Sequence, residues 1–228
     1  MQRYHFRVQK IFSGFFACVV LLLQPALSMD AAAKNMQVES LGGGVDRQPI
    51  NDGRDMLHTS SARFAVIGDF GQAGQPEADV AALVNSWNPQ FILTTGDNNY
   101  AVGGAATIDT NIGQYYHQYI QPYGGAYGAG ASSNNFYPSL GNHDWLTRAA
   151  GLPQPYLDYF SLPGNERYYD FMRGPLHFFV LDSDPHEPDG ISQTSAQAVW
   201  LRNGLLASSS AWNIVLLHHA PFSSGLHG

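Results

Sequence analysis

Cysteine is almost absent from this chain of 228 residues, which contains only one, Cys18. A single cysteine cannot form an intramolecular disulfide, so the fold must rely on its apolar core. Charged residues are also few, at 13% of the chain, and the 11 Lys and Arg are outnumbered by 18 Asp and Glu, which gives a net charge of −7. So acidic a chain is a poor general binder of nucleic acid, and it can receive a phosphate group only where bound cations reverse the local field.

No apolar run in the sequence is long enough to span a membrane. The strongest one, residues 11–23, falls short of the roughly 20 residues that a spanning helix needs. Three basic residues precede this run, and a proline and small residues follow it. This order is typical of a secretory signal peptide rather than a membrane anchor, so we expect residues 1–28 to be cleaved. Such a signal would direct the protein to a periplasmic or extracellular location. Its cleavage would leave no stable membrane insertion and would remove Cys18.

The rest of the chain divides into two parts. Residues 29–61 contain an Ala triplet and a Gly triplet and show no sustained periodicity, so we expect a flexible linker. From residue 62 onward, short apolar runs alternate with turns and helical patterns. We therefore expect one α/β domain over residues 62–228, which is long enough to bury a core.

The domain opens with a strand–helix–strand pattern. Residues 64–67 and 91–93 are short apolar strands, and Pro76 lies where the first turn of a helix would begin. Between the strands, apolar residues recur at the spacing of one helix face: Val80, Leu83, Val84 and Trp87. This order predicts a right-handed βαβ unit with parallel strands.

The elements that follow are predicted from shorter signals. A helix is expected over 107–120, with Ile108, Ile112, Tyr115, Tyr116 and Tyr119 inward, and a short helix over 153–160. Residues 168–171 and 176–181 resemble paired strands, Thr194 or Ser195 could cap another helix, and 214–217 form the last strand.

A further apolar run begins at Phe136, ends at Gly141 and is predicted to be a strand. With those at 64–67, 91–93 and 214–217, it makes four predicted strands that end in groups able to bind metal ions. Side chains at strand ends are a common way to build an α/β active site, and Asp, Asn, His and Tyr suit hard and borderline metals. Two carboxylates from neighbouring strand ends can hold two cations, which activate water and clamp a phosphoryl group. The groups, in chain order, are Asp69, then Asp97 with Tyr100, then Asn142 with His143, and finally His218 with His219.

These segments resemble the calcineurin-like metallophosphoesterases and, within that superfamily, the purple acid phosphatases. The resemblance covers residues 63–228 and implies a four-layer α/β/β/α sandwich of two mixed sheets. It rests on four blocks in the family's order: Gly68-Asp69-Phe70-Gly71, Gly96-Asp97-Asn98-Asn99-Tyr100, Gly141-Asn142-His143-Asp144 and Val215-Leu216-Leu217-His218.

The resemblance implies a role for each metal-binding residue. Asp69 and Tyr100 would ligate a first metal, an iron(III), and Asp97 would bridge both metals. Asn142 and His218 would ligate the second, which is iron, zinc or manganese in different family members.

The resemblance also implies a reaction on a small phosphorylated substrate. A phosphomonoester would be hydrolysed by attack of a metal-bound hydroxide. His143 would contact the phosphate, Asp144 would orient His143, and His227 would bind substrate and help to protonate the leaving group.

The family's fifth block, Gly-His-x-His, which gives one histidine to each metal, does not occur in these 228 residues. We expect it, and the last part of the fold, to lie beyond Gly228, which would leave the strand at 214–217 with an open edge. Two alternatives to a phosphomonoesterase therefore stay open. One is a phosphodiesterase of the same superfamily, although Gly-Asp-x-x-Tyr favours the purple acid branch. The other is a catalytically silent fragment. The oligomeric state is not predicted.

Each candidate residue also has a purely structural interpretation. Asp69 and Asp97 could be turn residues, and Tyr100 could be a packed aromatic. His219 fits a packed or supporting neighbour better than a ligand, and His227 could be an idle surface histidine. The remaining candidates are interpreted as structural, namely His117, His177, His186 and the acidic turn at 182–187.

Overall fold

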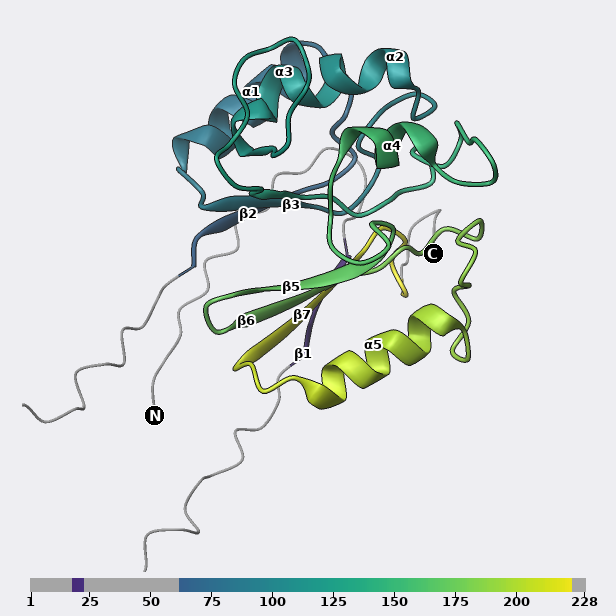
Figure 1. Cartoon of the computed structure of the whole chain (residues 1–228). Coiled ribbons are helices and arrows are strands. Elements are labelled where there is room, and N and C mark those ends of the chain that lie inside the picture. The colour runs from purple at the N-terminus through teal and green to yellow at the C-terminus, as the bar shows by residue number, and fades with distance from the viewer. Residues whose placement is uncertain (1–17, 23–61, 223–228) are drawn as a thin grey trace, which may run out of the picture.

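The computed structural model describes residues 18–22 and 62–222, whose strands form two sheets packed face to face (Figure 1). The three-stranded sheet is wholly parallel and has the order β2 (Phe64–Ile67), β3 (Phe91–Thr94), β4 (Phe136–Tyr137). In the four-stranded sheet β7 is parallel to β6, and the two outer pairings are antiparallel. Its order is β1 (Cys18–Leu22), β7 (Trp212–Leu217), β6 (Leu176–Val180), β5 (Tyr169–Arg173).

Helices cover the outer face of each sheet, which confirms the four-layer α/β/β/α sandwich (Figure 1). The helix α5 (Ala196–Ala207) lies on the four-stranded sheet and is capped by Ser195, whose Oγ accepts from the Ala198 backbone N–H. The helices over the three-stranded sheet are α1 (Gln75–Ser86), α2 (Ala105–Ile108), α3 (Gln114–Tyr116) and α4 (Gln154–Tyr159). The expectation of two mixed sheets is therefore met by one sheet only. Both connections within the other run through helices, which return the chain to a parallel strand.

The inward face of α1 differs from the predicted one. Pro76 lies in the first turn as expected, where its missing N–H costs nothing. The buried residues are Glu77, Ala81 and Val84, whereas Leu83, predicted to face inward, is 42% exposed. The face of the helix that packs on the sheet is thus the one that carries Glu77, Ala81 and Val84, and the Glu77 carboxyl group enters the core.

The segment predicted as one helix over 107–120 is helical but irregular. After α2 it widens into a π turn, η1 (Asp109–Gly113), narrows again into α3, and ends in the 3₁₀ turn η2 (His117–Tyr119). Three of the residues predicted to face inward are buried, Ile108, Ile112 and Tyr116. The predicted side of the helix is therefore largely correct, although the backbone geometry changes along it.

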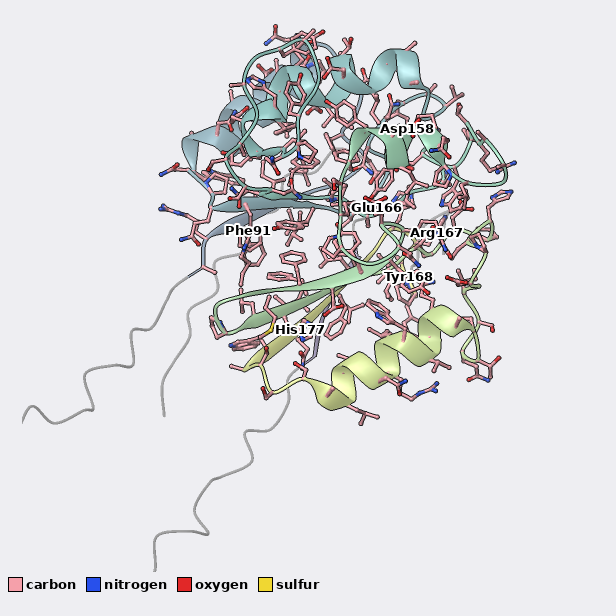
Figure 2. The ribbon with its side chains drawn as sticks, viewed as in Figure 1. Phe91, Asp158, Glu166, Arg167, Tyr168 and His177 are labelled. Atoms are coloured by element: carbon pink, nitrogen blue, oxygen red, sulfur yellow. The ribbon has the colours of Figure 1, made fainter. Side chains whose placement is uncertain are left out.

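Aromatic rings fill the space between the sheets. Phe91 of β3 lies there (Figure 2), stacked on Phe64 of β2 with ring centroids 5.2 Å apart. Phe178 of β6 meets both rings edge-on, at 5.3 Å and 5.6 Å. The guanidinium of Arg173 lies 5.7 Å from the centre of the Phe91 ring. The two sheets therefore share one core.

Strand β1 gives a result that the sequence did not predict. Its five residues fall inside the predicted signal peptide, yet their backbone pairs antiparallel with β7 from Cys18–Leu217 to Leu22–Asn213. In the uncleaved chain, the edge of β7 that was expected to be open is therefore covered. The rest of 1–28 and the predicted linker 29–61 lie outside the described residues. Within the part of the chain that the structure describes, no helix is long and apolar enough to cross a membrane.

Candidate metal centre

The predicted metal-binding groups meet at one edge of the three-stranded sheet. Asp69 follows β2 and Asp97 follows β3, and because these strands are parallel both residues leave the sheet at the same end. The Asp69 backbone N–H donates to the Gly96 carbonyl at 3.1 Å, which holds the two strand ends together. Both aspartates adopt a left-handed backbone, with φ of 52° and 53°, a conformation that Asp tolerates better than most non-glycine residues.

His218 brings a ligand from the other sheet to the two carboxylates. Ligand atoms of Asp69, Asp97 and His218 all lie within 4.8 Å of one another. Tyr100 lies beside them, since its hydroxyl is 2.8 Å from Asp97 Oδ2 and 3.2 Å from Asp69 Oδ1. Four of the five predicted ligands are thus in one cluster. The fifth, Asn142, lies next to the cluster, where its side chain contacts His218.

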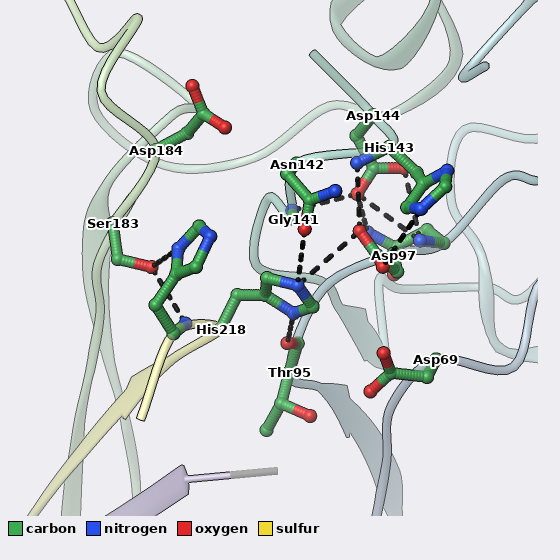
Figure 3. A network of polar contacts seen from close by, with 12 residues as sticks. Asp69, Thr95, Asp97, Gly141, Asn142, His143, Asp144, Ser183, Asp184 and His218 are labelled. Carbon is green, nitrogen blue, oxygen red and sulfur yellow. Dashed lines mark hydrogen bonds and ion pairs between the residues drawn. The ribbon is translucent and has the colours of Figure 1, made fainter. Parts of the chain in front are cut away.

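The hydrogen bonds of His218 fix which of its nitrogens can bind a metal. Its Nδ1 lies 2.8 Å from the Thr95 carbonyl oxygen (Figure 3). A carbonyl oxygen can only accept, so Nδ1 carries a proton, and Nε2 is the nitrogen left to bind a metal. That Nε2 faces Asn142 Oδ1 at 3.1 Å and Asp97 Oδ1 at 3.5 Å. A metal cation bound between these three atoms could take a ligand from each.

Glycines allow this close approach of the loops. A Cβ added at Gly96 would lie 2.7 Å from His218 Nδ1 and 2.9 Å from the backbone of Gly141. One added at Gly141 would collide with the backbone nitrogen and carboxylate of Asp97. The glycine that precedes each ligand in these two blocks is therefore a steric requirement of the site.

The electrostatics of the cluster also fit a bound cation. Burial raises the pKa of Asp69, the neighbouring Asp97 raises it further, and His218 and Tyr100 oppose the shift. Burial, followed by the charge of Asp97, raises the pKa of the Tyr100 phenol. The surroundings thus favour uncharged forms of two predicted ligands. A metal ion would reverse this preference, because its charge stabilises carboxylate and phenolate together.

His143 lies at the rim of the cluster. Its backbone N–H donates to Asp97 Oδ1 at 2.9 Å, and its Nδ1 lies 2.6 Å from the Ala101 carbonyl oxygen. The proton is therefore on Nδ1, and Nε2, 4.0 Å from Asp97 Oδ2, faces the site. The ring packs against Tyr100 with centroids 4.5 Å apart. This position suits a contact with a bound substrate.

Asp144 has different hydrogen-bond partners from the one expected, the ring of His143. Its hydrogen bonds in the described structure go to Asn98 and Gly141 rather than to the His143 ring, which is held by Ala101. The carboxyl group is 2% exposed, and burial raises its pKa to about 7. Asp144 thus ties the loop after β4 to the loop after β3. Asn98 was missed by the sequence reasoning, although it lies inside the second block.

The remaining candidates are placed outside the cluster. His227 lies beyond the described residues, so its role stays a prediction. His219 contacts Ser183, with Nδ1 to Oγ 2.8 Å, which agrees with a supporting role. His177 and His186 contact Asp170 and Asp184, respectively. The acidic segment 182–187 is a turn, as expected, but three of its carboxyl groups are buried. Among residues 18–22 and 62–222, Asp69, Asp97 and His218 form the only cluster of three or more acidic, His or Cys ligands.

Fold and donor set together define a class of protein: an α/β sandwich with a metal-binding group at the strand ends between its sheets. The family model of the calcineurin-like phosphoesterases matches residues 62–228, and the chain belongs to this family, as its blocks predicted.

Two curated proteins of Arabidopsis thaliana are similar to the chain. Purple acid phosphatase 17 is 29% identical, over 74% of this chain and 54% of its own length. Purple acid phosphatase 4 is 26% identical, over 94% of this chain and 65% of its own length. The chain thus spans less than two thirds of either relative.

Proposed function

We propose that this protein is an exported, metal-dependent phosphatase that hydrolyses phosphomonoesters. The observation that carries the proposal is the meeting of Asp69, Asp97, Tyr100 and His218 at one strand-end edge. Membership of the calcineurin-like phosphoesterase family and the similarity to two purple acid phosphatases support the reaction class. Export is supported by the signal-peptide pattern of residues 1–28.

The ligands divide between two metal ions. Asp69 and Tyr100 would hold the first, an iron(III), and Asn142 and His218 the second, which would be iron, zinc or manganese. Asp97 would be shared, because one of its oxygens contacts Tyr100 and the other faces His218. When bound, two such ions neutralise the charge of a phosphoryl group and lower the pKa of water to near neutrality.

The protein's own groups would bind and orient the substrate. The Nδ1 of His143 is held by the Ala101 carbonyl, so its Nε2 faces the site. When Nε2 is protonated, its N–H can donate a hydrogen bond to a phosphate oxygen. The Thr95 carbonyl keeps the His218 lone pair aimed at the metal position. His227 would assist the leaving oxygen. The acidic chain disfavours nucleic acid, so the proposed substrate is a small phosphorylated molecule.

The test compares two single variants, Asp97→Asn and His143→Ala, with the wild-type protein supplied with the same metals. Asp97→Asn should lose metal and turnover together, since the shared carboxylate is removed. His143→Ala should keep its metal and lose about 10²- to 10³-fold in kcat, the scale for one charge-stabilising donor. Metal content and turnover of 4-nitrophenyl phosphate are measured on each sample.

His177→Ala is the matched histidine control, because His177 binds Asp170 and Ser208 away from the cluster. It should retain both metal and turnover. Equal metal loss in Asp97→Asn and His143→Ala would make His143 a ligand. Faster turnover of bis(4-nitrophenyl) phosphate would favour the phosphodiesterase alternative, and wild-type protein without metal or turnover would favour the silent fragment.

A further inference from the structure

We infer that the Asp182–Ser183 turn, which follows β6, positions the two protein ligands of the second metal. These ligands, Asn142 and His218, come from different sheets, and the turn holds the loop of each. The inference rests on the proposed function, because it requires that Asn142 and His218 bind one ion.

The first link runs from the turn to the Asn142 loop. Trp145 lies three residues after Asn142, and its Nε1–H donates to Asp182 Oδ2 at 2.9 Å. Both side chains are 1% exposed, so this hydrogen bond has no competition from water. Since Trp145 belongs to the loop after β4, Asp182 fixes that loop against the four-stranded sheet.

The second link runs from the turn to the His218 loop. The Ser183 Oγ accepts from the backbone N–H of His219 at 3.0 Å and lies 2.8 Å from the ring Nδ1 of the same residue. His219 directly follows His218. Ser183 therefore holds the chain one residue beyond a predicted metal ligand, at both its backbone and its side chain.

The turn is itself held firmly. Gln197 of α5, which is 5% exposed, accepts from the Asp182 backbone N–H at 2.8 Å and donates to the Asp182 carbonyl at 2.9 Å. The other carboxylate oxygen of Asp182 accepts from the Asp184 N–H at 2.9 Å. A turn anchored in this way can serve as a fixed reference for the two loops.

Binding of the second metal depends on the Asp182–Ser183 turn more than binding of the first metal does. The Asn142 Oδ1 and His218 Nε2 atoms are 3.1 Å apart, and they would stay within reach of one ion only while the two loops keep their spacing. The predicted ligands of the first metal, Asp69 and Tyr100, both follow strands of the three-stranded sheet. In the described structure their side chains are hydrogen-bonded to each other and to Asp97, not to the turn. Loosening the turn should therefore weaken the second site selectively.

The test measures two stepwise Zn²⁺ affinities of the metal-free chain, by titration against a chelator. Asn142→Ala identifies the step that belongs to the second site, and Tyr100→Phe the step that belongs to the first. Trp145→Phe cuts the Asp182 link, and Ser183→Ala cuts the His219 link. Each should weaken second-site binding about 10-fold or more, the typical effect of removing a group that orients a ligand. First-site affinity should hold to within about 2-fold.

The double variant shows whether the two links act through one turn. If the spacing needs both links, then cutting one already releases it, and the combined loss in Trp145→Phe/Ser183→Ala should be smaller than the product of the single losses. Ser183→Thr keeps the hydroxyl and should restore wild-type affinity. Ser192→Ala is the matched control, because Ser192 is exposed and its Oγ contacts Thr194.

Each outcome bears on the inference. If the wild-type protein binds two Zn²⁺ ions and the variants bind them equally well, the positioning role is overturned and the proposed function stands. Equal weakening of both steps would show general loosening of the fold and would also overturn it. Wild-type protein that binds no Zn²⁺ would remove the metal centre and this inference with it.

Discussion

At the scale of single residues, the environment of Tyr100 depends strongly on the ion it would bind. Burial raises the pKa of its phenol, and the two carboxyl groups that the hydroxyl contacts raise it further, so the phenol stays protonated in the absence of a cation. Iron(III) would take the phenolate as a ligand and produce a charge-transfer band in the visible spectrum. We predict that Tyr100→Phe abolishes the band of the iron-loaded protein, whereas Tyr127→Phe, on an exposed residue, keeps it. A coloured Tyr100→Phe protein would contradict the assignment.

Glu77 makes a prediction about pH that is independent of the metals. It is 3% exposed on α1, and burial raises its pKa to about 8, with Tyr116 opposing the shift. The folded state therefore binds this proton more tightly than the unfolded state. Its contribution to stability is complete below pH 4.5, the ordinary value, and is lost as the pH rises through about 8.

Glu77→Gln should remove this loss. The free energy of unfolding of the variant relative to wild type should rise between pH 5 and pH 8, by an amount on the order of a few kcal/mol. Urea unfolding at several pH values measures the difference. Asp79→Asn, an exposed change on the same helix, should give a flat difference curve. A flat curve for Glu77→Gln as well would show that Glu77 is not protonated in the folded protein.

At the scale of elements, the loops after β2 and β3 touch through a glycine. A Cβ at Gly71 would collide with the Asn98 carbonyl, and Asn98 in turn holds the buried Asp144. We predict that Gly71→Ala lowers the free energy of unfolding by about 1–3 kcal/mol, which is the usual cost of adding a group to a well-packed core. The substitution should also weaken metal binding. Gly124→Ala, at a position with open space, should be close to neutral in a thermal unfolding comparison.

Sequence patterns predicted the elements better than the contacts between them. Asp69 and Asp97 could be placed at strand ends because an apolar run and the glycine that ends it are local signals. The bonds from Asn98 to Asp144 and from Trp145 to Asp182 join residues 46 and 37 positions apart, and no local pattern encodes such distances. The inward face of α1 was misjudged at Leu83 for the same reason, since the sheet decides which side is covered.

At the scale of the whole molecule, the two sheets should unfold as one unit. Phe178 of β6 contacts Phe64 and Phe91 of the opposite sheet, so its removal leaves a cavity that both sheets line. We predict that Phe178→Ala costs about 3–5 kcal/mol of stability and keeps a single cooperative transition. Far-UV and near-UV circular dichroism in urea should give coincident curves.

The control for this prediction is Leu206→Ala, on a side chain of α5 that is 78% exposed. It should change the unfolding midpoint little, because almost no buried surface is lost. Separate transitions for the two optical probes in Phe178→Ala would instead show that each sheet is stable on its own.

The left-handed backbone of Asp69 and Asp97 limits which amino acids can replace them before any chemistry is considered. At φ near 50°, glycine and asparagine are the natural substitutes, whereas a β-branched residue would be strained by roughly 1–3 kcal/mol. In a library of all substitutions at these two positions, valine and isoleucine would be depleted by misfolding and would say little about ligation. Asparagine alone keeps both the backbone and the size of the side chain while it removes the charge. Only that substitution separates what the ion needs from what the turn needs.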